Sequence, residues 1–220
     1  MRIVIVEDQA IFREMLRNMC VTKFGHEVLG EAPDGREAVR LADELSPELM
    51  LLDLELPVMD GFAVIVELKA KAGCPKLLVF SSYCDEFTVL RLEQLGVEGF
   101  VDKNTSTASA LESAFAAIER GGRFFSATFQ QVRTARRANS ASFDKLLSER
   151  EQRVLALIGE LLSDEKIGAR LGISDRTAET HRFNIMRKLG INTRLDLERY
   201  ARDHGFTQSV VKPPPGSGLR

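Results

Sequence analysis

Four short apolar runs in the first half of the chain are each followed by polar or charged side chains. Glu7 and Asp8 follow RIVIV, Asp53 follows LMLL, Ser81 follows LLVF, and Lys103 comes shortly after GFV. The runs have the length and composition of buried strands. In an open parallel α/β sheet, the carboxyl ends of the strands border one crevice. We therefore expect these five side chains to converge, although they lie far apart in the sequence.

The first 125 residues alternate strand-like and helix-like segments about five times. The segments between the apolar runs carry apolar residues at a spacing of 3.6, which is typical of amphipathic helices. Such alternation predicts a doubly wound α/β domain with a five-stranded parallel sheet and helices on both faces. Asp34 can cap one helix, and Gly121 and Gly122 can end another. The expected strands are RIVIV, EVLGEA, ELMLL, KLLVF and VEGFV.

The side chains at the strand ends suit the acceptance of a phosphoryl group. A carboxylate such as Asp53 attacks phosphorus poorly while both are anionic, so a divalent cation has to neutralise them. Glu7, Asp8 and Asp53 offer the oxygen ligands that Mg²⁺ prefers. Lys103 would contact the transferred oxygens as a point charge, and Ser81 would donate a hydrogen bond to one of them. Each residue alone could be an ordinary cap, turn or surface residue. Their occurrence together at four successive strand ends favours a phosphoryl-accepting site.

These motifs resemble the receiver domain of bacterial two-component response regulators. The resemblance covers residues 1 to about 122 and rests on VEDQ, LLDLELPVMDG, FSS and FVDK. It implies a flavodoxin-like fold, a histidine kinase that phosphorylates Asp53, and a Mg²⁺ shell completed by the main chain of Glu55. It also implies that Ser81 moves toward the phosphoryl group while Phe100 turns inward. Phe100 could instead be an ordinary core aromatic residue.

The rear of the chain carries the signals of four short helices. Ser148 and Glu151 match an S-x-x-E capping box, and Ser163, Ser174 and Thr193 can each cap a further helix. A helix, a tight turn and a second helix of this length can place one helix in a DNA major groove. A small helical interaction domain is the alternative. The third helix has one largely apolar face that we expect to point inward, formed by Ala178, His181, Ile185 and Leu189.

Residues 146 to 205 resemble the LuxR-type helix-turn-helix of the NarL/FixJ group. The resemblance rests on LSEREQRVL, ISDRT, THRFNIMRKLG and RLDLERYA, and it implies a small all-α DNA-binding domain of four helices. Double-stranded DNA is then the expected partner. The candidate DNA contacts are Lys166, Arg176, Thr177, Glu179, Thr180, Arg182, Phe183, Asn184, Arg187 and Lys188.

Several positions depart from the pattern of that group, among them Asp164-Glu165-Lys166, which replaces the more common Asn-Lys-Glu order. Ala178 and Glu179 stand where valine and lysine are common, and Leu161 replaces the usual glycine of a turn. An acidic side chain repels phosphate, although it could accept a hydrogen bond from a cytosine amino group. We therefore expect DNA binding that is weaker per subunit than is typical and that depends on dimerisation.

Charge and composition divide the chain into four parts. Residues 1–125 carry a net charge of −8, residues 126–145 one of +3 and residues 146–208 one of +1. The acidic first part does not favour nucleic acid, whereas the mildly basic rear permits it. Residues 126–145 have the composition of a linker, with a short helix over 130–137 as an option. The last part, residues 209–220, mixes proline and glycine and is expected to be disordered.

No apolar run approaches the roughly 18 residues of a membrane span, and the N-terminus does not match a signal peptide. We therefore expect a cytoplasmic protein without a membrane partner. The sequence predicts a transcription regulator, not an enzyme, in which phosphorylation of Asp53 controls a homodimer. Two alternatives remain. An aspartyl phosphatase would use Asp53 and Glu55, but it would place them after its first strand; a signalling module would act through protein partners instead of DNA.

Overall fold

The chain forms two compact units in a computed structural model that describes residues 1–105, 107–139 and 142–206. Among the residues described, no helix is long and apolar enough to cross a membrane. The expected disordered tail, residues 209–220, lies outside the described residues. The first unit contains residues 1–84 and 91–131, and the second contains residues 85–90 and 132–206.

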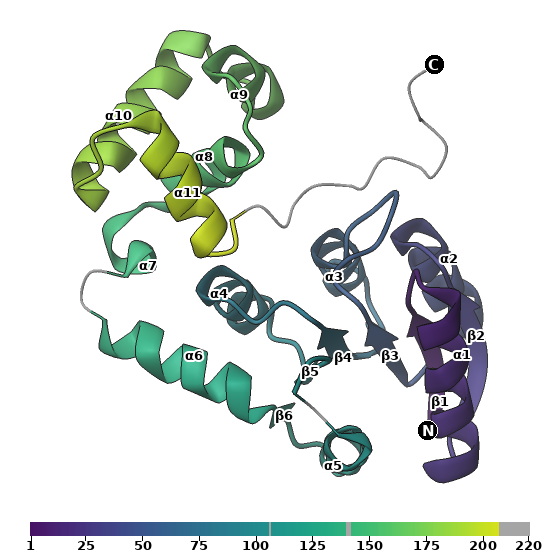
Figure 1. The fold of residues 1–220 in the computed structure, drawn as a ribbon. Helices are drawn as coiled ribbons and strands as arrows, with labels where there is room; N and C mark the ends of the chain where they lie inside the picture. Colours follow the sequence, from purple (N-terminus) through teal and green to yellow (C-terminus); the bar gives the residue numbers. More distant parts are fainter. Residues whose placement is uncertain (106, 140–141, 207–220) are drawn as a thin grey trace. The chain divides into compact units, whose positions relative to one another are not determined.

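The first unit is built on a parallel sheet with the strand order β2-β1-β3-β4-β5-β6 (Figure 1). The prediction of a doubly wound domain with parallel strands is confirmed for β1 to β5. The sheet also gains β6, a strand of two residues that is too short to have a recognisable pattern in the sequence. The strands are β1 (Arg2–Val6), β2 (Glu27–Ala32), β3 (Leu49–Leu52), β4 (Lys76–Ser81), β5 (Gly99–Asp102) and β6 (Phe124–Phe125).

Helices follow the strands and cover the sheet. Alternate strand residues point to opposite faces, and one face packs against Leu16 of α1 and Phe115 of α5. The side chain of Asp34 accepts hydrogen bonds from two backbone amides at the start of α2, as its position in the sequence predicts. The helices here are α1 (Ala10–Asn18), a π-helical turn η1 (Met19–Lys23), α2 (Gly35–Leu45), α3 (Gly61–Lys69), α4 (Glu86–Leu95) and α5 (Ala108–Glu119).

The range expected to be a linker is mostly helical. Helix α6 (Ala127–Ala138) begins three residues before the short helix that the sequence allowed. Phe129 is fully buried, and its ring centroid lies 4.6 Å from that of Phe125 and 5.2 Å from that of Phe100. One aromatic side chain packed on the sheet therefore anchors a segment whose composition is otherwise small, polar and basic.

From residue 142 to residue 206, the second unit contains the four predicted helices and one short helix before them. The side chains of Ser148, Ser163, Ser174 and Thr193 each accept a hydrogen bond from a backbone amide three residues later, so the predicted helix starts are confirmed. The full capping box of Ser148 and Glu151 is also present. The helices are α7 (Phe143–Leu146), α8 (Glu149–Gly159), α9 (Asp164–Leu171), α10 (Asp175–Leu189) and α11 (Arg194–Asp203).

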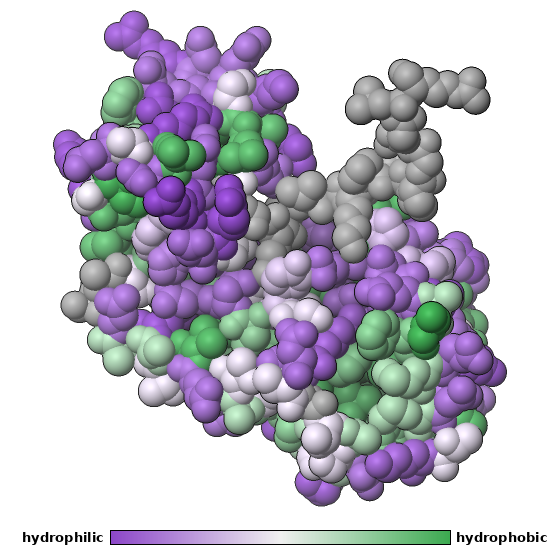
Figure 2. Space-filling view, in the orientation of Figure 1, coloured by the Kyte–Doolittle hydropathy of each residue, from purple (hydrophilic) through white to green (hydrophobic). Residues whose placement is uncertain are grey.

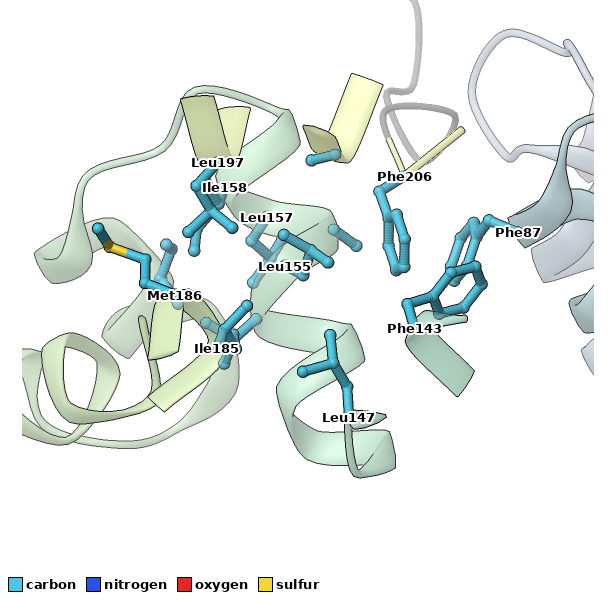
Figure 3. Close-up of a cluster of buried hydrophobic side chains, with 14 of the residues drawn as sticks. Phe87, Phe143, Leu147, Leu155, Leu157, Ile158, Ile185, Met186, Leu197 and Phe206 are labelled. Carbon is cyan, nitrogen blue, oxygen red and sulfur yellow. The ribbon is translucent and has the colours of Figure 1, made fainter. Parts of the chain in front are cut away.

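Aromatic rings form one end of the core of the second unit (Figure 3). Phe87 stacks on Phe206 with ring centroids 4.2 Å apart, and Phe143 meets Phe206 edge-on at 4.7 Å. Leu155 and Ile158 of α8 continue the core toward the other helices. Residues 85–90 thus complete a core whose other members come from the rear of the chain.

Candidate functional site

The structure brings Glu7, Asp53 and Lys103 together at the carboxyl end of the sheet. The Nζ atom of Lys103 lies 2.6 Å from Oε2 of Glu7 and 2.7 Å from Oδ2 of Asp53. Both carboxylates are almost fully buried. The topology explains the convergence, because β1, β3, β4 and β5 are neighbours in a parallel sheet and their carboxyl ends meet along one edge.

Burial and charge act in opposite directions on this cluster. Burial raises the pKa of Glu7, and the hydrogen bond and charge of Lys103 offset this only in part. Burial by itself would lower the pKa of Lys103, but the carboxylates of Asp53 and Glu7 raise it above its usual value. Lys103 is therefore a firmly held cation beside Asp53.

The acidic residues fit a divalent cation. One carboxylate oxygen each from Glu7, Asp8 and Asp53 lie within 4.8 Å of one another. In proteins, Mg²⁺ is bound by carboxylate oxygens and retains several water molecules as further ligands. Glu55, expected to contribute its main chain, lies two residues beyond Asp53 and is half-buried. Its role as a ligand stays a prediction.

Ser81 ends β4 beside the cluster. Its side chain is fully buried, and its backbone carbonyl accepts a hydrogen bond of 2.9 Å from the amide of Lys103. Its hydroxyl oxygen accepts a bond of 3.3 Å from the amide of Tyr83. On the neighbouring strand β5, Phe100 is fully buried and packs against Phe129. Phe100 therefore lies inside the core in this structure. Its movement on phosphorylation stays a prediction.

The loop that follows Asp53 approaches the site closely. A Cβ atom at Gly61 would lie 2.4 Å from the carbonyl oxygen of Asp53, a distance that real Cβ atoms do not tolerate. The amide of Gly61 also donates a hydrogen bond of 3.0 Å to the carbonyl of Leu54. Only glycine can occupy this position without displacing the backbone of Asp53. The sequence contains the motif, but its steric reason becomes visible only in the fold.

The second unit exposes most of the predicted DNA contacts on α10. Ala178 and Ile185 are buried as expected, Met186 is buried as well, and His181 and Leu189 are half-buried. The sequence missed Met186 because it lies at the border of the apolar face. The exposed candidates are Lys166 on α9 and Arg176, Thr177, Glu179, Thr180, Phe183, Arg187 and Lys188 on α10, while Asn184 is half-buried.

Two of the predicted cationic DNA contacts, Arg182 and Lys188, form short ion pairs with acidic residues of other helices in the unit. The guanidinium of Arg182 lies 2.8 Å from Asp164 and is only 13% exposed. Lys188 lies 2.7 Å from Glu151, the glutamate of the capping box. These pairs join residues 18 and 37 positions apart, so no local sequence pattern reveals them. Arg182 in particular is held against α9 and is not a freely extended cation.

A shallow hollow lies between α9 and the exposed side of α10. Hydrophilic residues dominate the surface around these helices (Figure 2). Asp164 in the hollow is paired with both Arg182 and Arg194. The hollow is rich in acidic residues, and its lining consists of Asp164, Glu165, Asp175, Arg176, Glu179, Thr180 and Phe183.

The two units match two known families of domains. The description "Response regulator receiver domain" applies to residues 3–115, and "Bacterial regulatory proteins, luxR family" applies to residues 145–201. The chain belongs to the LuxR-type two-component response regulators. Family and fold therefore agree with the prediction from the sequence. Members of this family are transcription factors, not conventional enzymes.

Relatives of similar length match this chain over more than nine tenths of its residues. Transcriptional regulatory protein YdfI of Bacillus subtilis is 31% identical over 213 residues, which cover 93% of this chain and 97% of the relative. Response regulator protein VraR of Staphylococcus aureus is 30% identical over 207 residues, covering 94% and 99%. RcsB of Salmonella enterica serovar Typhimurium, solved bound to a promoter, has a TM-score of 0.65 at 22% identity and covers 92% of this chain and 98% of its own. RcsB thus shows the shared fold.

Proposed function

We propose that Asp53 of this response regulator accepts a phosphoryl group from a histidine kinase, and that the phosphorylated protein binds double-stranded DNA as a homodimer in the cytoplasm. The buried contact of Lys103 with both Asp53 and Glu7 carries the proposal. A cation held beside an acidic cluster is the arrangement that stabilises charge on a transferred phosphoryl group. The match to both domain families supports the link to DNA.

The residues of the site have distinct roles in the transfer. The Oδ1 atom of Asp53 accepts a hydrogen bond of 2.7 Å from the amide of Leu54, which orients the carboxylate. A bond then forms between an Asp53 oxygen and phosphorus while the phosphorus–nitrogen bond of the phosphohistidine breaks. Glu7, Asp8 and Asp53 would hold a Mg²⁺ ion, which would supply neutralising charge. Lys103 balances the oxygens of the transferred group.

Phosphorylation changes the charge at the edge of the sheet. The phosphoryl group adds about −1.5 to −2 charge at Asp53 and three acceptor oxygens. The Ser81 hydroxyl can donate to one of these oxygens, which draws the end of β4 toward the site. This local change favours pairing of two chains. A pair presents two copies of α10 to half-sites about one helical turn of DNA apart, roughly 10 base pairs.

The test combines a phosphorylation assay with sedimentation and DNA binding. Wild-type protein, Asp53→Ala and the control Asp43→Ala, an exposed carboxylate on α2, are each mixed with an acyl phosphate donor and Mg²⁺. We expect mass spectrometry to show one added phosphoryl group on the wild type and Asp43→Ala only, and EDTA to abolish it. The same two proteins should dimerise and retain genomic DNA fragments. Equal behaviour of Asp53→Ala would refute control by phosphorylation.

A further inference from the structure

The exposed side of α10 presents an acid and an aromatic ring on one stripe. Arg176, Glu179, Thr180 and Phe183 follow the spacing i, i+3, i+4 and i+7, which places them along one face of the helix. The side chain of Glu179 is 50% exposed, and Phe183 is 56% exposed. The hydroxyl of Thr180 already donates to the carbonyl of Arg176 at 2.8 Å. Glu179 and Phe183 are therefore the distinctive chemical groups that this stripe offers to a ligand.

The ring of Phe183 is held in place although it faces solvent. The guanidinium carbon of Arg182 lies 4.6 Å from the centre of the ring, within the range of a cation–π contact. Arg182 is itself fixed by Asp164, which accepts hydrogen bonds from both its Nε and Nη2 atoms. A chain of contacts from α9 thus orients an apolar surface outward. Such an ordered ring loses little conformational entropy when it contacts a ligand.

Charge makes the neighbouring hollow unsuitable for a phosphate. Arg182 and Arg194 neutralise the charge of Asp164. The lining holds three further acidic residues but only one basic residue, Arg176. The acidic residues are Glu165, Asp175 and Glu179. Glu179 also lies 3.7 Å from Arg182, but the much closer Asp164 holds that arginine. A carboxylate only accepts hydrogen bonds, so it needs a donor from the ligand.

DNA provides such a donor in the major groove. The donors there are the amino groups N4 of cytosine and N6 of adenine, and glutamate is the typical partner of the cytosine amino group. An exposed apolar side chain finds its counterpart in the C5-methyl group of thymine. Glu179 and Phe183 are four residues apart, about 6 Å along the helix axis. Base pairs are spaced by about 3.4 Å, so the two contacts fall on base pairs within about two steps.

We infer that Glu179 and Phe183 select the target sequence: Glu179 accepts a hydrogen bond from a cytosine amino group, and Phe183 packs on the methyl group of a thymine within two base pairs of it. This inference rests on the proposed DNA-binding function and adds the class of sequence that is bound. Contacts with the DNA phosphates then come from other exposed residues of α10, such as Arg187 near its end.

The test starts with selection of duplexes from a random pool by the phosphorylated full-length protein. We expect selected half-sites to contain a cytosine and a thymine within two base pairs. Exchange of that cytosine·guanine pair for thymine·adenine should weaken wild-type binding about tenfold. Glu179→Gln should remove most of this preference. Replacement of the thymine by uracil, which deletes only the methyl group, should weaken the wild type and leave Phe183→Ser unchanged.

Glu165→Gln is the matched control because it removes one negative charge from the same hollow without changing α10. We expect it to increase affinity for all duplexes and to retain the cytosine preference. If Glu179→Gln discriminates cytosine from thymine as well as the wild type does, the inference is wrong while the proposed function stands. If the phosphorylated wild type binds no duplex even at low salt, the proposed function and the inference fail together. Thermal unfolding measured by circular dichroism verifies that each variant is folded.

Discussion

The backbone conformation of Leu161 gives a physical meaning to a position that the sequence marks only as a departure from a pattern. Leu161 follows α8 with a φ of +61°, in the left-handed region that glycine adopts without strain. The sequence marks this position only as a place where glycine is usual in similar domains. The side chain is 62% exposed, so little packing compensates for the strain.

Leu161→Gly is expected to stabilise the second unit. Removal of Cβ relieves about 1 kcal/mol of left-handed strain, part of which the greater freedom of glycine in the unfolded chain offsets. The measurement is thermal unfolding followed by circular dichroism. Leu161→Ala keeps Cβ and should not raise the unfolding temperature. A rise of the same size in Leu161→Ala would show that loss of the exposed side chain is the cause.

Gly61→Ala is expected to slow phosphorylation of Asp53. The new Cβ atom would meet the carbonyl of Asp53 at 2.4 Å, so the backbone that positions the carboxylate has to shift. The rate of phosphorylation by an acyl phosphate should fall at least about tenfold, because a displacement of about 1 Å can reduce a rate a hundredfold. Gly73→Ala also strains the backbone, because Gly73 has a φ of +77°, but its new Cβ meets no atom within 4 Å, so this variant should keep the wild-type rate. An unchanged rate in Gly61→Ala would contradict the steric explanation.

At the scale of elements, the capping box of α8 also links this helix to α10. The capping box at the start of α8 was visible in the sequence, but the same Glu151 carboxylate also accepts a hydrogen bond of 2.7 Å from Lys188 of α10. Burial tends to raise the pKa of Glu151, and the hydrogen bonds from Lys188 and Ser148 more than offset this, so the pKa is lowered. One carboxylate therefore both starts α8 and joins it to α10.

Glu151→Gln is expected to lower the unfolding free energy at neutral pH by about 1 kcal/mol, the typical contribution of a helix cap. Because the pKa is lowered on folding, this stabilisation is present above the unfolded value of about 4.3 and is lost as the pH falls through the folded value. The difference from the wild type should therefore shrink below about pH 4. Glu149→Gln, an exposed first-turn control, should show a smaller effect. A difference independent of pH would contradict the ionic role.

On the scale of the whole molecule, one compact unit includes a segment that is distant in the sequence, and the domain ranges read from the sequence stay a prediction. The predicted front domain ends at residue 125, yet residues 85–90 belong to the second unit. Helix α6 passes through the boundary between the units, within the range expected to be a linker. The alternation of strands and helices predicted which elements form, but it contained no information about the partners of Phe87.

Phe87→Ala is expected to destabilise the second unit, although residue 87 lies among the receiver elements in the sequence. The ring is 7% exposed and stacks on Phe206, so its loss leaves a cavity that costs about 3 kcal/mol. Calorimetry of the full chain should show a lower unfolding temperature. Ile11→Ala, whose side chain is 83% exposed on α1, should have little effect. Equal unfolding temperatures for Phe87→Ala and the wild type would contradict the packing role.

The sequence by itself determined β1 to β5 and the starts of the capped helices, because hydrophobic periodicity and capping are local properties. It did not determine β6, α7 or the start of α6. It also predicted that Asp53 and Lys103 meet, because strand order in a doubly wound sheet follows general rules. Only the tertiary structure decided that Phe129 anchors α6 and that Arg182 is bound to Asp164. Such pairings depend on the packing of segments far apart in the chain, and no local pattern encodes the distance between them.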